Sequence, residues 1–480
     1  MAQSRQHHLR GSGVAAGPVQ PEPQPDGGRV GAVAARVFRA RRVQRAGAGA
    51  ARGEQPQRSD LHAAAVAAAG GGGVILEGRL WHPQNGLTEG CVAVGDDGAI
   101  ERVAKTMAGR KQRVCGMLLP AGFDMHVHFR DPGFPQKETW ASGSAAAACG
   151  GVTAVVDMPN TQPPTDSPTA FATKAQRAAA ASVVDFGLGV SARPGISREA
   201  WFGELPAAFW KLYPYGKSWE DYRATATEVT AAGGRPLVIH GEHPSHIDMS
   251  PPTELAEHTA HRRLAEAECL AGMPASPQLH VAHLSTADGL AGLPAGATAE
   301  VCPHHLLLNL DACDSIDCKV DPPLRTPRDN AALWAGFRDG RIAVLASDHA
   351  PHLPEEKASD NPPSGIPGVE TMVPLMLQQV SAGRLALGRL VNAMAEAPAD
   401  RLGLPRGRIA AGQPADLIEV DLKAARPVAL EQLHSRAGWS PYEGWDAIFP
   451  QRVWRRGELV AADGELQASR GGRPLFTAQP

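Results

Sequence analysis

Between about residues 120 and 400, short apolar runs alternate with alanine-rich stretches of helical character. Short apolar runs bounded by turn residues predict buried strands. Eight such runs end in "DMHVHF", "TAVVDMPN", "VDFGLGVS", "FWKLYPYG", "PLVIHGE", "LHVAHLS", "TAEVCPHH" and "IAVLASDH". Alternating strands and helices predict a parallel sheet, and eight units predict a closed (β/α)8 TIM-like barrel. We place this α/β barrel at residues 120–404.

The segments on either side of the barrel have a different pattern. "VILEGRLW" and "CVAVGDDGAIERVA" precede it, and "ADLIEVDL" and "RVWRRGELVAADGELQ" follow it. Each indicates short strands separated by turn residues. We therefore predict a small β-sandwich domain built from both ends of the chain, residues 73–119 plus 405–470.

Residues 1–72 are rich in Ala, Gly, Pro and Arg and contain few large apolar side chains. Such a segment cannot bury enough apolar surface to offset the entropy of ordering, so we predict a disordered tail. Its Arg-rich, acid-poor part ("VAARVFRARRVQRAG") also fits an organellar transit peptide. An extended reading frame or a mis-assigned start is the simpler interpretation.

Composition and charge argue against some classes of function. Lys and Arg number 47 and Asp and Glu number 50, so no global basic field predicts nucleic acid or membrane as a partner. No apolar run is long enough to span a bilayer. The seven cysteines show no paired zinc spacing, and an odd number without a disulfide framework predicts a reducing compartment. We expect a cytoplasmic protein, or an organellar one if the tail is a targeting signal.

Polar side chains collect at the carboxyl ends of the predicted strands. His126 and His128 are two apart and share one face of a strand. Alone, this pair fits two hydrogen-bonded histidines as well as a metal site. Further candidates on later strands are Asn160, Lys211, His240, His283 and Asp348. Because barrel strands end at one mouth, four histidines with an acid and a lysine predict a metal site there.

The ligand types indicate the metal. Imidazole and carboxylate suit zinc or a similar divalent ion, and six ligands are too many for one catalytic zinc with an open position. Two ions are therefore predicted. A buried Lys211 could lose its proton, add carbon dioxide and bridge the ions as a carbamate. An ion pair with an acidic residue is the simpler alternative for Lys211.

Several motifs resemble dihydroorotases of the amidohydrolase superfamily, above all the type found as a domain of the animal multifunctional pyrimidine-biosynthesis protein. They are "DMHVHFRDPG", "KETWASGSAAAACGGVTAVVDMPNTQPP", "WKLYPYG", "ASDHAPH", "EEK", "GIPGVETMVPL" and "WSPYEG", within about residues 75–465. The resemblance implies one zinc ion on His126, His128, carboxylated Lys211 and Asp348, and a second on Lys211, His240 and His283. It also implies substrate binding by Arg130, Asn160, His352 and the backbone near Gly365.

The implied reaction is the reversible cyclisation of N-carbamoyl-L-aspartate to (S)-dihydroorotate and water, in de novo pyrimidine (UMP) biosynthesis. A hydroxide that bridges the metal ions would attack the ring amide, with Asp348 as general acid and base. Arg130 would hold the substrate carboxylate through its planar fork of donors. The resemblance further implies a homodimer or a complex with aspartate transcarbamoylase.

Some positions depart from the family pattern. The animal domain binds a further zinc through a cysteine where this chain has Ala282, so a third zinc is not expected although Glu300 is kept. It has a substrate-binding arginine where this chain has Asp321, and Arg325 is a nearby candidate substitute. The loop "YPYGKSWED" differs as well.

Two alternatives stay open. Another cyclic amidohydrolase, such as an allantoinase or dihydropyrimidinase, would share the metal ligands but not the "FRDPG" and "MPNT" pair. A dihydropyrimidinase substrate would also lack the carboxylate that Arg130 binds. A non-catalytic partner of aspartate transcarbamoylase would have lost metal ligands, whereas every ligand position is filled here.

Overall fold

The computed structural model describes residues 74–193, 205–247, 254–313 and 315–477. The tail predicted for residues 1–72 lies outside these ranges. Within them, none of the helices combines the length and the apolar character that crossing a bilayer requires.

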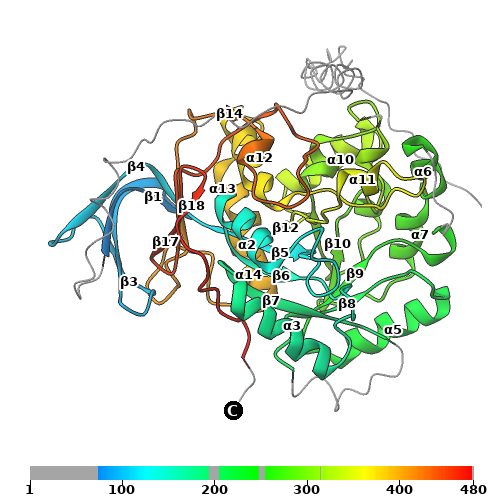
Figure 1. Ribbon diagram of the computed structural model, residues 1–480. Helices are drawn as coiled ribbons and strands as arrows, with labels where there is room; N and C mark the ends of the chain where they lie inside the picture. Colours follow the sequence, from blue (N-terminus) through cyan, green and yellow to red (C-terminus); the bar gives the residue numbers. More distant parts are fainter. Residues whose placement is uncertain (1–73, 194–204, 248–253, 314, 478–480) are drawn as a thin grey trace, which may run out of the picture.

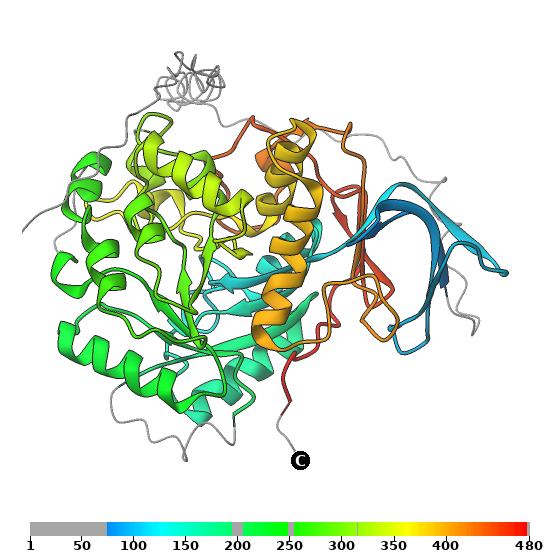
Figure 2. The same ribbon diagram turned by 180° about the vertical axis from the view of Figure 1, so that it is seen from behind.

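Eight parallel strands form a nearly closed barrel, as the sequence predicts (Figures 1 and 2). Their order in the sheet follows the chain: β5 (Gly122–Val127), β6 (Val152–Asp157), β7 (Asp185–Ser191), β8 (Phe209–Leu212), β9 (Leu237–His240), β10 (Leu279–Ala282), β11 (Thr298–Val301) and β12 (Val344–Leu345). A parallel bridge between Val127 and His349 brings the first strand beside the segment that follows the last. There the amide of His128 donates to the carbonyl of His349 at 2.8 Å.

The barrel strands are buried except for one end residue each of β7 and β11. All six residues of β5 and all six of β6 are buried. Helices cover the outer face and side chains fill the interior, so the apolar runs are continuous rather than alternating. Several helices begin at side-chain caps: Ser167 accepts from the amide of Ala170, and Thr326 accepts from that of Asp329.

The helices surround the barrel (Figure 1). After β5 and β6 come α2 (Trp140–Cys149) and α3 (Pro168–Ala181), and after β8 comes α5 (Trp219–Ala232). The segment between β9 and β11 holds η1 (Pro244–His246), α6 (Leu255–His261), α7 (Ala265–Ala271) and α8 (Ala287–Ala291). Then follow α9 (Pro303–Leu307), η2 (Ile316–Cys318), α10 (Pro327–Arg338), α11 (Pro354–Lys357), α12 (Val369–Ser381), α13 (Leu387–Val391), η3 (Asn392–Glu396) and α14 (Ala397–Leu402).

The two ends of the described chain form a second sheet, which confirms a β unit built from both sides of the barrel segment (Figure 2). It contains β1 (Val74–His82), β2 (Gly86–Val94), β3 (Ile100–Ala104), β4 (Lys111–Pro120), β13 (Leu417–Val420), β16 (Arg452–Arg455), β17 (Glu458–Ala462) and β18 (Glu465–Leu466). Strands β4 and β13 pair at its centre. Leu76, Leu118, Leu417 and Trp454 belong to one apolar core shared by both ends. A separate ribbon pairs β14 (Arg426–Pro427) with β15 (Asp446–Ala447), and η4 (Leu430–Gln432) lies between them.

Candidate metal centre and substrate cavity

A cavity of about 380 Å³ opens where the predicted site residues meet at the ends of the barrel strands. All of the predicted site residues except Lys211 line it: His126, His128, Arg130, Asn160, His240, His283, Asp348, His352 and Gly365. Residues more than 200 positions apart in the chain thus share one cavity because the closed parallel barrel brings its strand ends together.

One end of the cavity is a cluster of histidines around Asp348. The Nε2 atoms of His126 and His128 lie 3.2 Å and 3.1 Å from Oδ1 of Asp348. The ligand atoms of these three residues all lie within 4.8 Å of one another. The rings of His240 and His283 are 4.6 Å apart, and that of His283 is 5.3 Å from that of His126. The four imidazoles are therefore contiguous.

The hydrogen bonds of these rings suit metal ligation. Nδ1 of His126 pairs with Glu300, Nδ1 of His128 lies 2.7 Å from Oδ1 of Asn160, and Nε2 of His240 lies 2.7 Å from Oε2 of Glu242. An oxygen acceptor holds the proton of a neutral ring on the nearer nitrogen and leaves a lone pair on the other. Such outer partners are typical of metal-binding histidines.

Nδ1 of His283 and Nζ of Lys211 are among the buried side-chain atoms that have no hydrogen-bond partner within the described residues. Buried polar atoms are nearly always paired, so these two atoms call for a ligand. The donor set of imidazoles, a carboxylate and an amine fits divalent metal ions.

Lys211 lies on β8 beneath the cavity and is only 1 % exposed. Burial lowers the pKa of its ammonium to about 8, although the charges of Glu300 and Asp348 oppose the shift. The ion pair considered as an alternative for Lys211 is not formed: Nζ has no hydrogen-bond partner among the described residues and lies 5.2 Å from the centre of the Tyr213 ring. A neutral amine is the form that could add carbon dioxide.

Three site residues have a left-handed backbone: Arg130 (φ 61°), His283 (φ 38°) and Asp348 (φ 45°). This conformation is uncommon for residues other than glycine and carries a cost of roughly 1–3 kcal/mol each. It turns the chain sharply at the ends of three barrel strands, where these side chains face the cavity.

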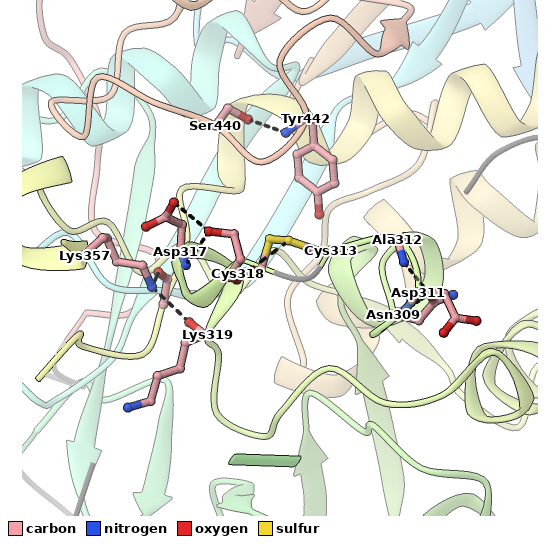
Figure 3. The surroundings of a disulfide bond; sticks show 12 residues. Asn309, Asp311, Ala312, Cys313, Asp317, Cys318, Lys319, Lys357, Ser440 and Tyr442 are labelled. Carbon is pink, nitrogen blue, oxygen red and sulfur yellow. Dashed lines mark hydrogen bonds between the residues drawn. A yellow bond between two sulfur atoms is a disulfide. The ribbon is translucent and has the colours of Figure 1, made fainter. Parts of the chain in front are cut away.

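Two loop segments, residues 319–321 and 361–365, also contribute to the lining of the cavity, and we call them the loop wall. Nζ of Lys357 donates to the carbonyls of Lys319, Pro363 and Gly365 at 3.1, 2.9 and 3.1 Å. Figure 3 shows its bond to Lys319, close to a disulfide between Cys313 and Cys318. Lys357 therefore ties the two segments of the wall together.

The sequence analysis missed this disulfide and several cavity residues. The cysteines are only five apart among seven scattered ones, which is no recognisable framework. Tyr215, Arg262 and Lys319 also line the cavity. Each lies in a loop or a helix beyond a strand end, where no sequence pattern fixes the direction of the side chain.

The expectation that Arg325 substitutes at the cavity is wrong. Its guanidinium contacts Ser285, the carbonyl of Arg262 and Glu242, and it does not line the cavity. Arg262 does, and its NH1 lies 2.9 Å from Oδ1 of Asp321. Although burial opposes it, His258 and Arg262 hold the pKa of Asp321 well below its usual range.

Comparison with known proteins identifies the family of this chain. Residues 117–460 match the model of the amidohydrolase family. The chain belongs to the amidohydrolase family. It is 40 % identical over 375 residues to a dihydroorotase of Halobacterium salinarum, with 74 % of this chain and 89 % of that protein covered. It is 35 % identical over 398 residues to a dihydroorotase of Methanosarcina acetivorans, with 74 % and 84 % covered.

Solved structures of amidohydrolases share the fold. An L-hydantoinase (dihydropyrimidinase) from Arthrobacter aurescens has a TM-score of 0.75 at 28 % identity and covers 84 % of this chain and 99 % of its own. A dihydropyrimidinase from Brevibacillus agri has a TM-score of 0.75 at 22 % identity, with 85 % and 100 % covered, and supports the fold alone. The two dihydroorotase relatives named above are archaeal, so the likeness to the animal domain stays a prediction.

Proposed function

We propose that this amidohydrolase is a dihydroorotase, which interconverts (S)-dihydroorotate and N-carbamoyl-L-aspartate. One observation carries the proposal: an imidazole–carboxylate cluster and an arginine, Arg130, face the same cavity. The cluster suits cleavage of an amide, and the arginine suits a substrate that carries a carboxylate. The relatives named dihydroorotase support the same substrate.

The metal ligands would be those implied by the sequence. His126, His128 and Asp348 would hold one zinc ion, His240 and His283 the other, and carboxylated Lys211 would bridge them. Bound zinc would polarise the ring carbonyl and lower the pKa of water towards neutrality. Ala282 offers no donor beside Glu300, and Glu300 is already paired with His126 and His280, so a third zinc there is not proposed.

The protein side chains would bind the substrate and move its protons. Arg130, Asn160 and His352 would hold the substrate carboxylate, and the backbone at Gly365 would contact the ring. During hydrolysis Oδ1 of Asp348 would accept a proton from the attacking water and pass it to the ring nitrogen as the C–N bond breaks.

A substrate panel tests the proposal. The purified chain, loaded with zinc, is assayed with dihydroorotate, dihydrouracil, hydantoin and allantoin. We expect turnover of dihydroorotate alone. Turnover of dihydrouracil or hydantoin in its place would assign the chain to the hydantoinase-like enzymes, and no turnover with no bound zinc would favour a non-catalytic partner of aspartate transcarbamoylase.

The assembly and location stay predictions. Sedimentation of the purified chain, alone and with aspartate transcarbamoylase, would distinguish a homodimer from such a complex. The proposed cytoplasmic location would be tested by imaging a tagged full-length chain beside one that lacks residues 1–72.

A further inference from the structure

Lys137 makes a contact that the proposed reaction does not use. It lies in the loop between β5 and α2, with its side chain 14 % exposed. Its Nζ is 3.1 Å from Nδ1 of His352 and 2.9 Å from Oε1 of Glu356. His352 is buried and lines the cavity.

This contact determines which nitrogen of His352 carries the proton. An ammonium group only donates hydrogen bonds, so Nδ1 of His352 must be the acceptor. The nearest carboxylate to Nδ1, Oε2 of Glu356, is 3.7 Å away and too far for a hydrogen bond. Burial, with Arg130, Lys137 and Lys357 nearby, lowers the pKa of His352 well below its usual range. The ring is therefore neutral, with its proton on Nε2.

The Nε2–H of His352 lies beside a second donor. Nε2 is 3.0 Å from the carbonyl of Ser364, which can accept this proton, and 3.0 Å from NH2 of Arg130. A guanidinium has no acceptor atom. With the proton on Nε2 donated to Ser364, His352 offers no acceptor to NH2 of Arg130. A substrate carboxylate oxygen can accept from NH2 of Arg130 instead, and its negative charge strengthens that hydrogen bond.

We propose that Lys137 is a positioning residue that keeps the proton of His352 on Nε2, where it donates to the carbonyl of Ser364, so that Arg130 keeps its own donor for the substrate carboxylate. The inference rests on the proposed dihydroorotase function. Without Lys137, the proton could move to Nδ1. Nε2 would then accept from Arg130, and this internal hydrogen bond would occupy the donor that the substrate needs.

The variant Lys137→Met tests the role of the ammonium. We expect KM for dihydroorotate to rise about tenfold, which corresponds to one charge-assisted hydrogen bond, and kcat to change less than about twofold. Lys137→Arg keeps a cationic donor and should restore KM to within about threefold of the parent. Lys423→Met, in an exposed loop beyond β13, is the matched control and should leave both constants unchanged.

A double-mutant cycle distinguishes this role from general support of the fold. If Lys137 acts through His352, Lys137→Met should raise KM less than about twofold in a His352→Phe background. An equal increase in both backgrounds would overturn the inference. The melting temperature and zinc content of each variant identify any loss of folding. If Lys137→Met fails to fold, Lys137→Arg is used as the test in its place. A tenfold higher KM in Lys137→Arg would also overturn the inference.

Arg130→Met separates this inference from the function on which it rests. A large increase in KM for dihydroorotate supports the carboxylate site whatever Lys137 does. If that increase occurs while Lys137→Met leaves KM unchanged, only the role of Lys137 is wrong. If Arg130→Met leaves KM unchanged, the proposed carboxylate site and the inference are both wrong.

Discussion

The histidine cluster and the loop wall line the same cavity but are built differently. The histidines stand at strand ends, and acceptors on the barrel fix their rings: Glu300 on β11 holds His126, and Glu242 after β9 holds His240. The loop wall, residues 319–321 and 361–365, has no strand beneath it. Hydrogen bonds from Lys357 to three carbonyls hold it instead.

This difference suggests that the two regions have different roles. Ligands fixed by a closed barrel keep a constant geometry, which metal ions require. A wall held by hydrogen bonds between loop residues, from Lys357, from Nζ of Lys319 and from the amide of Gly365, can change with a few substitutions. We therefore expect substitutions in the cluster to affect metal content and turnover, and substitutions in the wall to affect KM.

The largest effect on metal content and turnover is expected from substitution of Lys211. Lys211→Ala removes the proposed bridge, so the chain should lose its metal and turnover should fall at least about 10⁴-fold. Short carboxylic acids should restore part of both by occupying the place of the carbamate. Metal analysis and steady-state assays, with and without added acid, provide the measurement. Unchanged turnover would contradict the bridge.

Asp348→Asn should separate proton transfer from metal binding. The amide keeps an oxygen ligand but cannot accept a proton, so most of the metal should remain while kcat falls roughly 10²–10⁴-fold. Zinc content measured beside kcat tests this expectation. A variant that keeps the parent kcat would exclude Asp348 as the general base.

Glu300→Gln should weaken metal binding, although Glu300 is not itself a proposed metal ligand. The carboxylate of Glu300 pairs with His126 and His280, and loss of such a partner typically lowers metal affinity roughly 10–100-fold. Competition with a chelator measures this affinity. An affinity equal to that of the parent would mean that the barrel alone orients His126.

Lys357→Met should have the smallest effect, confined to the loop wall. Three buried carbonyls would lose a donor, which costs about 1–3 kcal/mol of stability and loosens residues 361–365. KM should rise several-fold with zinc content unchanged, and hydrogen exchange should increase in the wall but not in β5. A loss of zinc would show that wall and cluster are not independent.

The difference between strand ends and loops also explains what the sequence could predict. The barrel and the second sheet could be predicted from the apolar runs and their order along the chain. The resemblance to dihydroorotases over most of the chain adds the predicted metal ligands. His126, His128, His240, His283 and Asp348 end strands, so their convergence follows from the closed barrel. The roles of Arg262, Lys319 and Lys357 could not be predicted, because long connections after β9, β11 and β12 carry them. Arg325 illustrates this limit: it is four residues from Asp321, yet its side chain faces Glu242 and Ser285.

Anomalous diffraction at the zinc edge, from crystals of the full chain grown with zinc and bicarbonate, tests the central claim most directly. The account predicts two peaks in the histidine cluster, one beside His126, His128 and Asp348 and one beside His240 and His283. Density for a carboxylated Lys211 should lie between them. A single peak away from these residues, or a bare Lys211 amine beside an empty cluster, would contradict it.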